Sequence, residues 1–161
     1  MSEKRKFKSV LEIIHERIMF NSLLSALMRF SMDLHLSQEE LAGMTSLERN
    51  CSKQISVVND IFSWEKELQA SKTGHSEGSV LCTAVKVLAE ETHLSIGASK
   101  RVLWSMAREW ENVHDEMVAE KVADNCTQAA RDYMKGLEYQ MSGNELWSRT
   151  TLRYNKLEQT G

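Results

Sequence analysis

Three oxygen-bearing side chains stand four residues apart in the middle of the sequence. They are Asn59, Ser63 and Glu67, which we call the oxygen stripe. In an α-helix of 3.6 residues per turn, this spacing places all three on one side. An amide oxygen, a hydroxyl and a carboxylate form the oxygen-only ligand set that Mg²⁺ prefers, with other coordination positions left for water or phosphate oxygens. Lys66, next to the carboxylate, is placed to meet the charge of a diphosphate that such a metal bridges.

The oxygen stripe borders an apolar helix face, since Val58 and Phe62 are its neighbours along the helix. A row of ligands at the mouth of a cavity would be placed in this way. The alternative is an ordinary amphipathic helix that shows polar residues at this spacing by chance, and such a row would tend to lie farther round toward solvent.

The whole pattern, Asn59-Asp60-x-x-Ser63-x-x-x-Glu67, resembles the second metal motif of class I terpene synthases, and the Lys-Glu pair at its end is similar to the fungal form. The resemblance implies that the oxygen stripe binds one Mg²⁺ of a trinuclear cluster, which ionises an isoprenoid diphosphate. It gives Asp60 only a supporting position behind the ligands.

A second segment near the C-terminus is similar to one in fungal terpene synthases. It runs from Gly143 to Ser148 and is followed by Arg153 and Tyr154. The nearest resemblance is to the cyclase domains of chimeric enzymes of the fusicoccadiene synthase type, which favours a C20 or C25 diphosphate as substrate. It implies that Arg153 and Tyr154 donate hydrogen bonds to the diphosphate, a role that suits a guanidinium fork and a phenol.

The sequence departs from the family pattern in two places. An aspartate-rich first metal motif should precede the oxygen stripe, but the sequence contains no Asp-Asp pair. The acidic cluster of Asp115, Glu116 and Glu120 lies after the stripe and is typical of a solvated helix face. Arg17 is the one candidate for the diphosphate-sensing arginine, although its flanking residues do not match the usual pattern.

The resemblance extends from about Leu23 to Tyr154. We therefore expect residues 1–161 to form a single helical unit, the C-terminal half of a terpene cyclase domain, with residues 1–20 divergent and residues 155–161 a tail. Such a unit would expose apolar surface to a missing N-terminal half or to another chain. Because the aspartate-rich first metal motif is absent from this sequence, we expect little cyclase activity from this chain alone.

Composition agrees with a helical, globular protein. Of 161 residues, 42% are hydrophobic and none is proline, and the formal net charge of -3 gives no reason to expect nucleic-acid binding. The three cysteines show no Cys-x-x-Cys spacing and suit a reducing compartment. The N-terminus lacks the apolar stretch of a secretory signal, and no apolar run is long enough to span a membrane. We expect a cytoplasmic protein.

Apolar periodicity and capping residues predict an all-α fold. Ser37 and Glu40 form a capping box, Ser95 is a further N-cap, and Asp124 or Asn125 is expected to open the last helix. Gly43 and the segment from Ser142 to Asn144 are expected to end helices. The expected helices cover residues 9–32, 38–42, 47–70, 79–91, 96–118 and 125–141.

Two alternatives to a cyclase remain open. One is a non-catalytic helical remnant of a cyclase, which would act as a protein-interaction module through its uncovered apolar face. The other is a soluble helical bundle in which the oxygen stripe is incidental.

Overall fold

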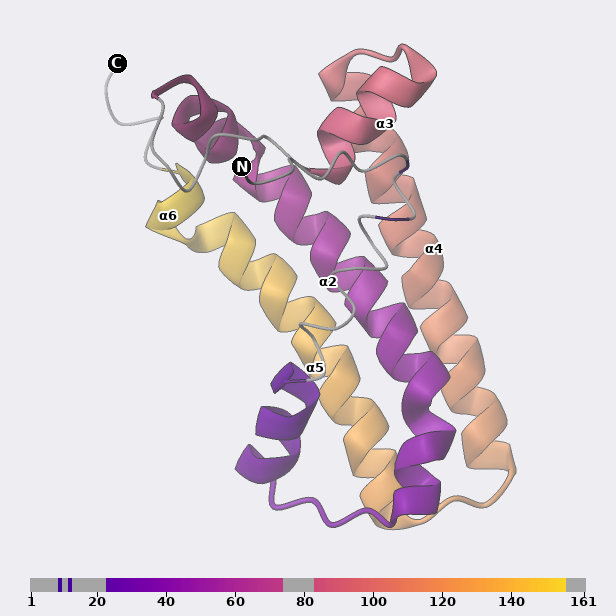
Figure 1. Cartoon of the computed structure of the whole chain (residues 1–161). Coiled ribbons are helices and arrows are strands. Elements are labelled where there is room, and N and C mark those ends of the chain that lie inside the picture. The colour runs from indigo at the N-terminus through magenta and orange to yellow at the C-terminus, as the bar shows by residue number, and fades with distance from the viewer. Residues whose placement is uncertain (1–8, 10–11, 13–22, 74–82, 156–161) are drawn as a thin grey trace, which may run out of the picture.

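The protein is all-α throughout the residues that the computed structural model describes, which are 9, 12, 23–73 and 83–155. Residues 23–31 are helical, and three long helices then lie side by side with two short ones at their upper ends (Figure 1). The labelled helices are α2 (Gln38–Thr73), α3 (Ala84–Thr92), α4 (Ile96–Ala123), α5 (Gln128–Thr150) and α6 (Leu152–Asn155). The predicted all-α class is confirmed.

Helix α4 packs along α2 in the antiparallel direction. Near the lower end of the pair, Asn50 Nδ2 donates a hydrogen bond of 2.5 Å to the carbonyl of Trp110. Near the upper end, Lys100 Nζ lies 2.8 Å from Glu65 Oε1. The residue numbers of α4 therefore fall as those of α2 rise.

Helix α5 packs along α2 in the parallel direction. The Cys51 thiol donates to the carbonyl of Leu137 at 3.6 Å. Four residues farther along α2, the carbonyl of Ile55 accepts from Asn144 Nδ2 at 3.3 Å. This direction carries the end of α5, and α6 after it, toward the part of α2 that holds the oxygen stripe.

Helix α2 contributes to two hydrophobic cores. The first lies between α2, α5 and residues 23–31, and its buried members are Met28, Met44, Leu47, Cys51, Ile55, Ala130, Tyr133, Met134, Leu137 and Met141. The second lies between α2, α3 and α4, and its buried members are Val57, Ile61, Trp64, Ala84, Val85 and Leu103. Burial on both sides positions α2 firmly between its neighbours.

Several predicted helix starts are confirmed. The Glu40 N–H donates to Ser37 Oγ at 3.1 Å and the Ser37 N–H donates to Glu40 Oε2 at 2.7 Å, which is the reciprocal capping box. Ser95 caps α4 by accepting from the Ala98 N–H. The last long helix starts later than predicted, because Asn125 adopts a left-handed backbone (φ 60°) and Thr127 is the N-cap of α5.

Two glycines that were predicted to end helices lie inside them instead. Helix α2 continues through Gly43, and α5 continues through Gly143 to Thr150. A glycine costs a helix interior about 1 kcal/mol relative to alanine. Burial of Met44 and Leu47 just after Gly43 outweighs that cost, and so does the bond from Asn144 to α2 just after Gly143.

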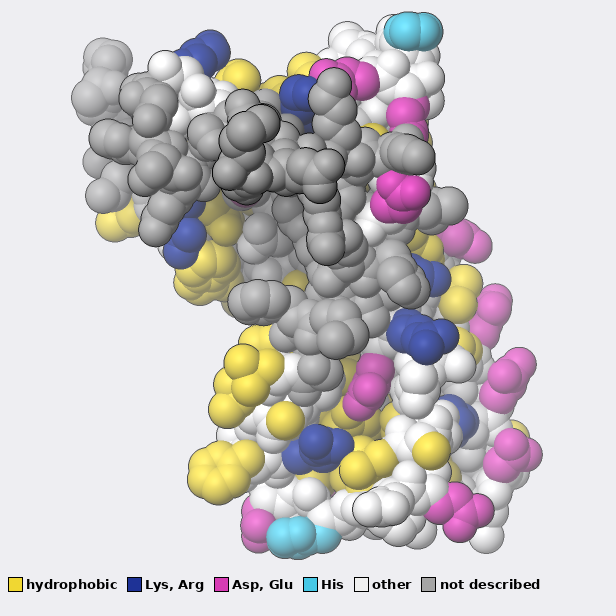
Figure 2. All heavy atoms as spheres, in the orientation of Figure 1, with side chains coloured by type: hydrophobic (Ala, Val, Ile, Leu, Met, Phe, Trp, Pro, Cys, Tyr) yellow, Lys and Arg dark blue, Asp and Glu magenta, His cyan; other side chains and the backbone are white. Residues whose placement is uncertain are grey.

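The helix of residues 23–31 packs against α5 through a close contact at Gly136. A Cβ placed on Gly136 would lie 2.3 Å from Met28 Sδ, so the absence of a side chain there lets the two helices approach. The outer side of this helix stays apolar and exposed, and Figure 2 shows hydrophobic side chains gathered over it at the lower left. These exposed residues are Leu23, Leu24, Leu27 and Phe30, the last 87% exposed.

Within the described part of the chain, no helix combines the length and the hydropathy needed to cross a membrane.

Candidate active site

The oxygen stripe forms on α2 as its spacing predicts. Ser63, only 2% exposed, donates from Oγ to Glu67 Oε1 at 2.7 Å, so the hydroxyl and the carboxylate one turn apart lie together. Asn59 is half-buried one turn before them. The bond leaves the second carboxylate oxygen and the lone pairs of Ser63 Oγ as acceptors.

Tyr154 meets the oxygen stripe from the other end of the chain. Asn59 Nδ2 donates to the Tyr154 hydroxyl oxygen at 3.2 Å, across 95 positions of sequence. The structure therefore brings together the predicted metal ligands on α2 and the predicted diphosphate donors on α6, which the sequence connects only through resemblance.

The backbone after α5 explains how Tyr154 reaches α2. We call residues 151–154 the C-terminal arm. Thr151 ends α5 with an extended backbone while its N–H still donates to the carbonyl of Trp147 at 2.8 Å. The Tyr154 N–H donates back to the carbonyl of Thr151 at 3.3 Å. This turn sets the Tyr154 ring edge-on to Trp147, with ring centroids 5.5 Å apart.

Asp60 has a different task from its neighbours in the motif. It is 1% exposed, and its Oδ2 accepts from the backbone N–H of Ala84 at 2.6 Å. Thr83 satisfies another N–H of the same helix, that of Lys86, at 3.1 Å. Asp60 therefore holds the start of α3 against α2, one residue after Asn59 of the oxygen stripe.

The structure shows fewer contacts for the remaining predicted site residues. Lys66 lies half-buried on the same turn of α2 as Glu67, and the Arg153 side chain is exposed on α6 next to Tyr154. Neither side chain has a hydrogen bond or ion pair to another residue that the structure describes. Arg17 lies outside the described residues.

The donor set of the oxygen stripe fits a hard divalent cation. Asn59 keeps Oδ1 available because its Nδ2 is the end engaged by Tyr154, and Ser63 and Glu67 add two further kinds of oxygen. Among the described residues, no group of three or more His, Cys, Asp or Glu side chains is placed to hold a metal ion. The acidic residues Asp115, Glu116 and Glu120 are exposed on α4, as predicted for a solvated face.

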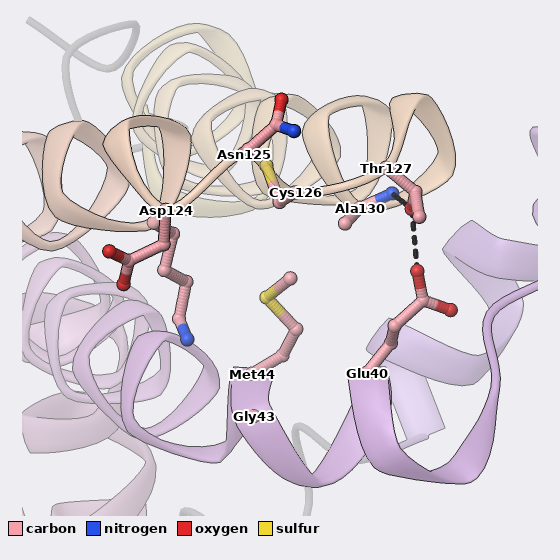
Figure 3. Close-up of a pocket in the computed structure, with 9 residues that line it drawn as sticks. Glu40, Gly43, Met44, Asp124, Asn125, Cys126, Thr127 and Ala130 are labelled. Carbon is pink, nitrogen blue, oxygen red and sulfur yellow. Dashed lines mark hydrogen bonds between the residues drawn. The ribbon is translucent and has the colours of Figure 1, made fainter.

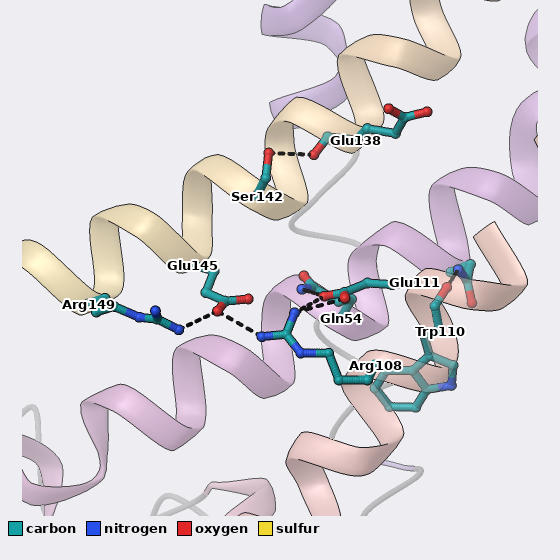
Figure 4. A network of polar contacts seen from close by, with 9 residues as sticks. Gln54, Arg108, Trp110, Glu111, Glu138, Ser142, Glu145 and Arg149 are labelled. Carbon is teal, nitrogen blue, oxygen red and sulfur yellow. Dashed lines mark hydrogen bonds and ion pairs between the residues drawn. The ribbon is translucent and has the colours of Figure 1, made fainter. Parts of the chain in front are cut away.

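A polar network joins the three long helices on the side shown in Figure 4. Arg108 Nη1 donates to both carboxylate oxygens of Glu111 at 2.8 Å, and Nη2 donates to Glu145 Oε1 at 2.8 Å. Arg149 donates to the same oxygen at 2.6 Å, and Gln54 Nε2 donates to Glu111 at 2.8 Å. The network fixes α5 relative to α2 and α4 in the turns that precede the C-terminal arm.

A cavity of about 260 Å³ lies near the start of α2 (Figure 3). Glu40, Lys121 and Cys126 are among its lining residues, and Thr127 donates to Glu40 there at 2.5 Å. Its nearest lining residue on α2, Met44, lies 15 positions before Asn59, which corresponds to roughly 22 Å of helix. The polar side chains around it cap the starts of α2 and α5, which gives them a structural role. None of the predicted site residues lines this cavity.

The fold and the oxygen stripe together define an all-helical protein with a candidate divalent-metal site. Residues 5–113 match the family described as terpene synthase family 2, C-terminal metal binding, and the chain belongs to that family. An aristolochene synthase of Penicillium rubens is 68% identical over 142 residues, which are 87% of this chain and 42% of that protein. The crystal structure of aristolochene synthase from Penicillium roqueforti superposes with a TM-score of 0.82 at 55% identity, covering 94% of this chain and 50% of that one.

These relatives confirm the predicted helical fold of class I terpene synthases and the fungal terpene synthase family, and they correct the subfamily. Fusicoccadiene synthase of Phomopsis amygdali is only 29% identical over 130 residues, far below the aristolochene synthases. The preference for a C20 or C25 substrate rested on that subfamily, so it loses its basis.

Two contacts of the site were not predicted from the sequence. Nothing in the sequence indicates the Asn59–Tyr154 bond, because Asn59 was predicted to bind a metal ion and Tyr154 a diphosphate, and the two residues are 95 positions apart. The bond from Asp60 to Ala84 had a partial signal, since an aspartate inside an apolar helix face needs a buried partner.

Proposed function

We propose that this chain supplies the second metal site and the diphosphate donors of a terpene cyclase, which ionises and cyclises an isoprenoid diphosphate with the help of Mg²⁺. The observation that carries the proposal is the contact between Asn59 on α2 and Tyr154 on α6, because it joins a set of hard oxygen ligands to a phenol donor and its neighbouring arginine. Family membership supports the same activity.

Each residue of the site has a distinct task in this proposal. Asn59, Ser63 and Glu67 would hold Mg²⁺, which when bound helps to neutralise the charge on the leaving diphosphate. Lys66 and Arg153 add positive charge that matches phosphate oxygens, and the Tyr154 hydroxyl adds a neutral donor.

The proposed substrate is a C15 diphosphate. Aristolochene is a sesquiterpene, and relatives of that name are 68% identical to this chain over 142 residues. The chain spans 42% of the length of those relatives, so the complete reaction is proposed for a protein that contains the remaining helices as well. The cytoplasmic location remains part of the proposal and is supported by the widely spaced cysteines.

Binding of inorganic diphosphate by the purified chain, measured by calorimetry with Mg²⁺ and with EDTA, tests the site without requiring turnover. We expect binding that needs Mg²⁺ and that is lost in E67K while circular dichroism shows unchanged helicity. The matched control is E65K, since Glu65 is exposed on the same helix and pairs with Lys100 away from the stripe. Equal binding by the wild type and E67K would refute the metal assignment.

Turnover is a separate question from binding. We expect little release of diphosphate from farnesyl diphosphate by this chain alone, because the sequence has no aspartate-rich motif to complete the clamp. Rapid, Mg²⁺-dependent release would show that the oxygen stripe and the C-terminal arm suffice.

A second candidate function, association with another protein, is favoured by one observation. Leu23, Leu24, Leu27 and Phe30 form an exposed apolar strip on the helix of residues 23–31. Such a strip is characteristic of a surface that packs against a partner. The double variant L27E/F30E should lower the apparent mass of the chain in light scattering if the strip drives self-association, without reducing diphosphate binding. An unchanged mass would argue against that use of the strip.

A further inference from the structure

We propose that Tyr154 is a positioning residue for the metal site: its hydroxyl oxygen engages Nδ2 of Asn59, keeps Oδ1 available as a ligand, and leaves its own proton free for a phosphate oxygen. This inference rests on the proposed function. It gives Tyr154 two simultaneous tasks, where the resemblance implied only one.

The argument starts from the two unlike ends of the Asn59 amide. Only its oxygen can ligate a cation, whereas its nitrogen is a donor. An amide with both ends unpaired can turn either end toward a ligand. The 3.2 Å bond from Asn59 Nδ2 to the Tyr154 oxygen selects one orientation, in which Oδ1 is the free end.

The Tyr154 hydroxyl retains its donor proton in this arrangement. A phenol has one proton and two acceptor lone pairs, and the bond from Asn59 uses a lone pair. The same oxygen can therefore accept from Asn59 while its proton is donated to a phosphate oxygen. Metal ligation and diphosphate recognition then meet at a single hydroxyl.

The position of Tyr154 is set by packing as well as by this bond. Its ring lies edge-on to Trp147, and the turn at Thr151 folds the C-terminal arm back toward α2. The Asn144–Ile55 bond fastens α5 to α2 just before the arm begins. Removing the hydroxyl should therefore release the Asn59 amide without displacing the arm.

The Y154F variant removes the hydroxyl and keeps the ring. We expect it to weaken binding of Mn²⁺ alone, measured by electron paramagnetic resonance on the purified chain, by about three- to tenfold, the effect of one net hydrogen bond. The matched control is R153Q, because the hydrogen bond that the structure shows for Asn59 goes to Tyr154 and not to Arg153. It should weaken binding of inorganic diphosphate and leave binding of Mn²⁺ alone unchanged. A Y154F chain that binds Mn²⁺ as tightly as the wild type would overturn the proposal.

A second measurement decides the inference even if the chain binds no Mn²⁺, an outcome that would count against the proposed function. The side-chain amide protons of Asn59 give their own signals in a ¹⁵N-correlated nuclear magnetic resonance spectrum. We expect these signals to shift, and to exchange faster with water, in Y154F but not in R153Q. Identical Asn59 signals in Y154F and the wild type would refute the inference independently of any metal.

The free proton is tested with N59D. A carboxylate at position 59 has no donor, so Tyr154 must give its proton to it. We expect Y154F to weaken Mg²⁺-dependent diphosphate binding at least threefold in the wild-type background, and less than twofold in the N59D background. Equal losses in both backgrounds would show that the Tyr154 proton is not reserved for phosphate.

Discussion

The carboxylate of Asp60 accepts a 2.6 Å hydrogen bond from the backbone N–H of Ala84, the first residue of α3. Asp60 is buried, so D60A would leave that N–H without its partner. We expect D60A to lower the free energy of unfolding by about 1.5–3 kcal/mol, the usual effect of losing a buried hydrogen bond to a charged group. Urea titration followed by circular dichroism measures this loss.

Two further variants define the role of Asp60. D60N keeps an acceptor oxygen and should lose less stability than D60A. The control E91Q, on the exposed end of α3, should stay within about 0.5 kcal/mol of the wild type. If D60A proved as stable as E91Q, the bond to Ala84 would contribute nothing measurable.

Arg108 bridges Glu111 and Glu145 with the two arms of one guanidinium, and its cation lies 5.1 Å from the Trp104 ring centre. A lysine at this position has a single ammonium and cannot reproduce both arms. We expect R108K to cost about 1 kcal/mol, a modest value because Arg108 is half exposed to solvent. The control is R101K on the exposed face of α4. Equal urea midpoints for the two variants would contradict the bridging role.

His114 is buried on α4, and neither of its ring nitrogens makes a hydrogen bond of normal geometry to a described residue. Burial lowers the pKa of His114 below its usual 6.5, while the charges of Glu138 and Asp115 and the nearby Met134 backbone act in the opposite direction. The unfolded chain therefore takes up this proton at a higher pH than the folded chain. The stability contribution is complete above pH 6.5 and is lost as the pH falls below it.

The variant H114Q tests this pH dependence. Between about pH 7 and pH 5, the urea concentration at the unfolding midpoint should fall less in H114Q than in the wild type, because the variant lacks the buried histidine. The control variant is H35Q, because the His35 side chain is exposed to solvent. A slope in H114Q as steep as in the wild type would assign the acid sensitivity to other groups.

Cys51 is buried in the first core, as expected for a cysteine that serves as a small apolar residue. Burial, helped by the charge of Glu48, raises the pKa of its thiol to about 12. Because the thiolate is the reactive form, native Cys51 should be alkylated by iodoacetamide more slowly than the half-buried Cys126. Mass spectrometry of labelled peptides measures both rates, and unfolding in urea should equalise them. Faster labelling of Cys51 than of Cys126 in the native chain would contradict its burial.

Local patterns predicted what local interactions determine. The Ser37–Glu40 capping box, the Ser95 cap and the spacing of the oxygen stripe all depend on residues within one or two turns, and the structure shows each of them. Patterning of this kind can be read before any tertiary contact is known.

Tertiary contacts explain the failures. Gly43 looked like a helix end, yet buried residues on the next turn keep α2 continuous through it. Two residues later, the Thr45 hydroxyl donates to the Ala42 carbonyl at 2.9 Å inside the continuous helix. The contact between Asn59 and Tyr154 depends on α5 running parallel to α2, which no local pattern in either segment encodes.

Helix α2 belongs to both hydrophobic cores, with Leu47 in the first and Ile61 in the second. Neither α5 on one side nor the α3–α4 pair on the other can detach without exposing an apolar face of α2. The amides of α2 should consequently exchange with solvent deuterium mainly through global unfolding, while those of the short α6 exchange through local fraying. The proposed metal ligands would then lie in the most slowly opening cooperative unit of the chain, and Tyr154 in the most quickly opening one.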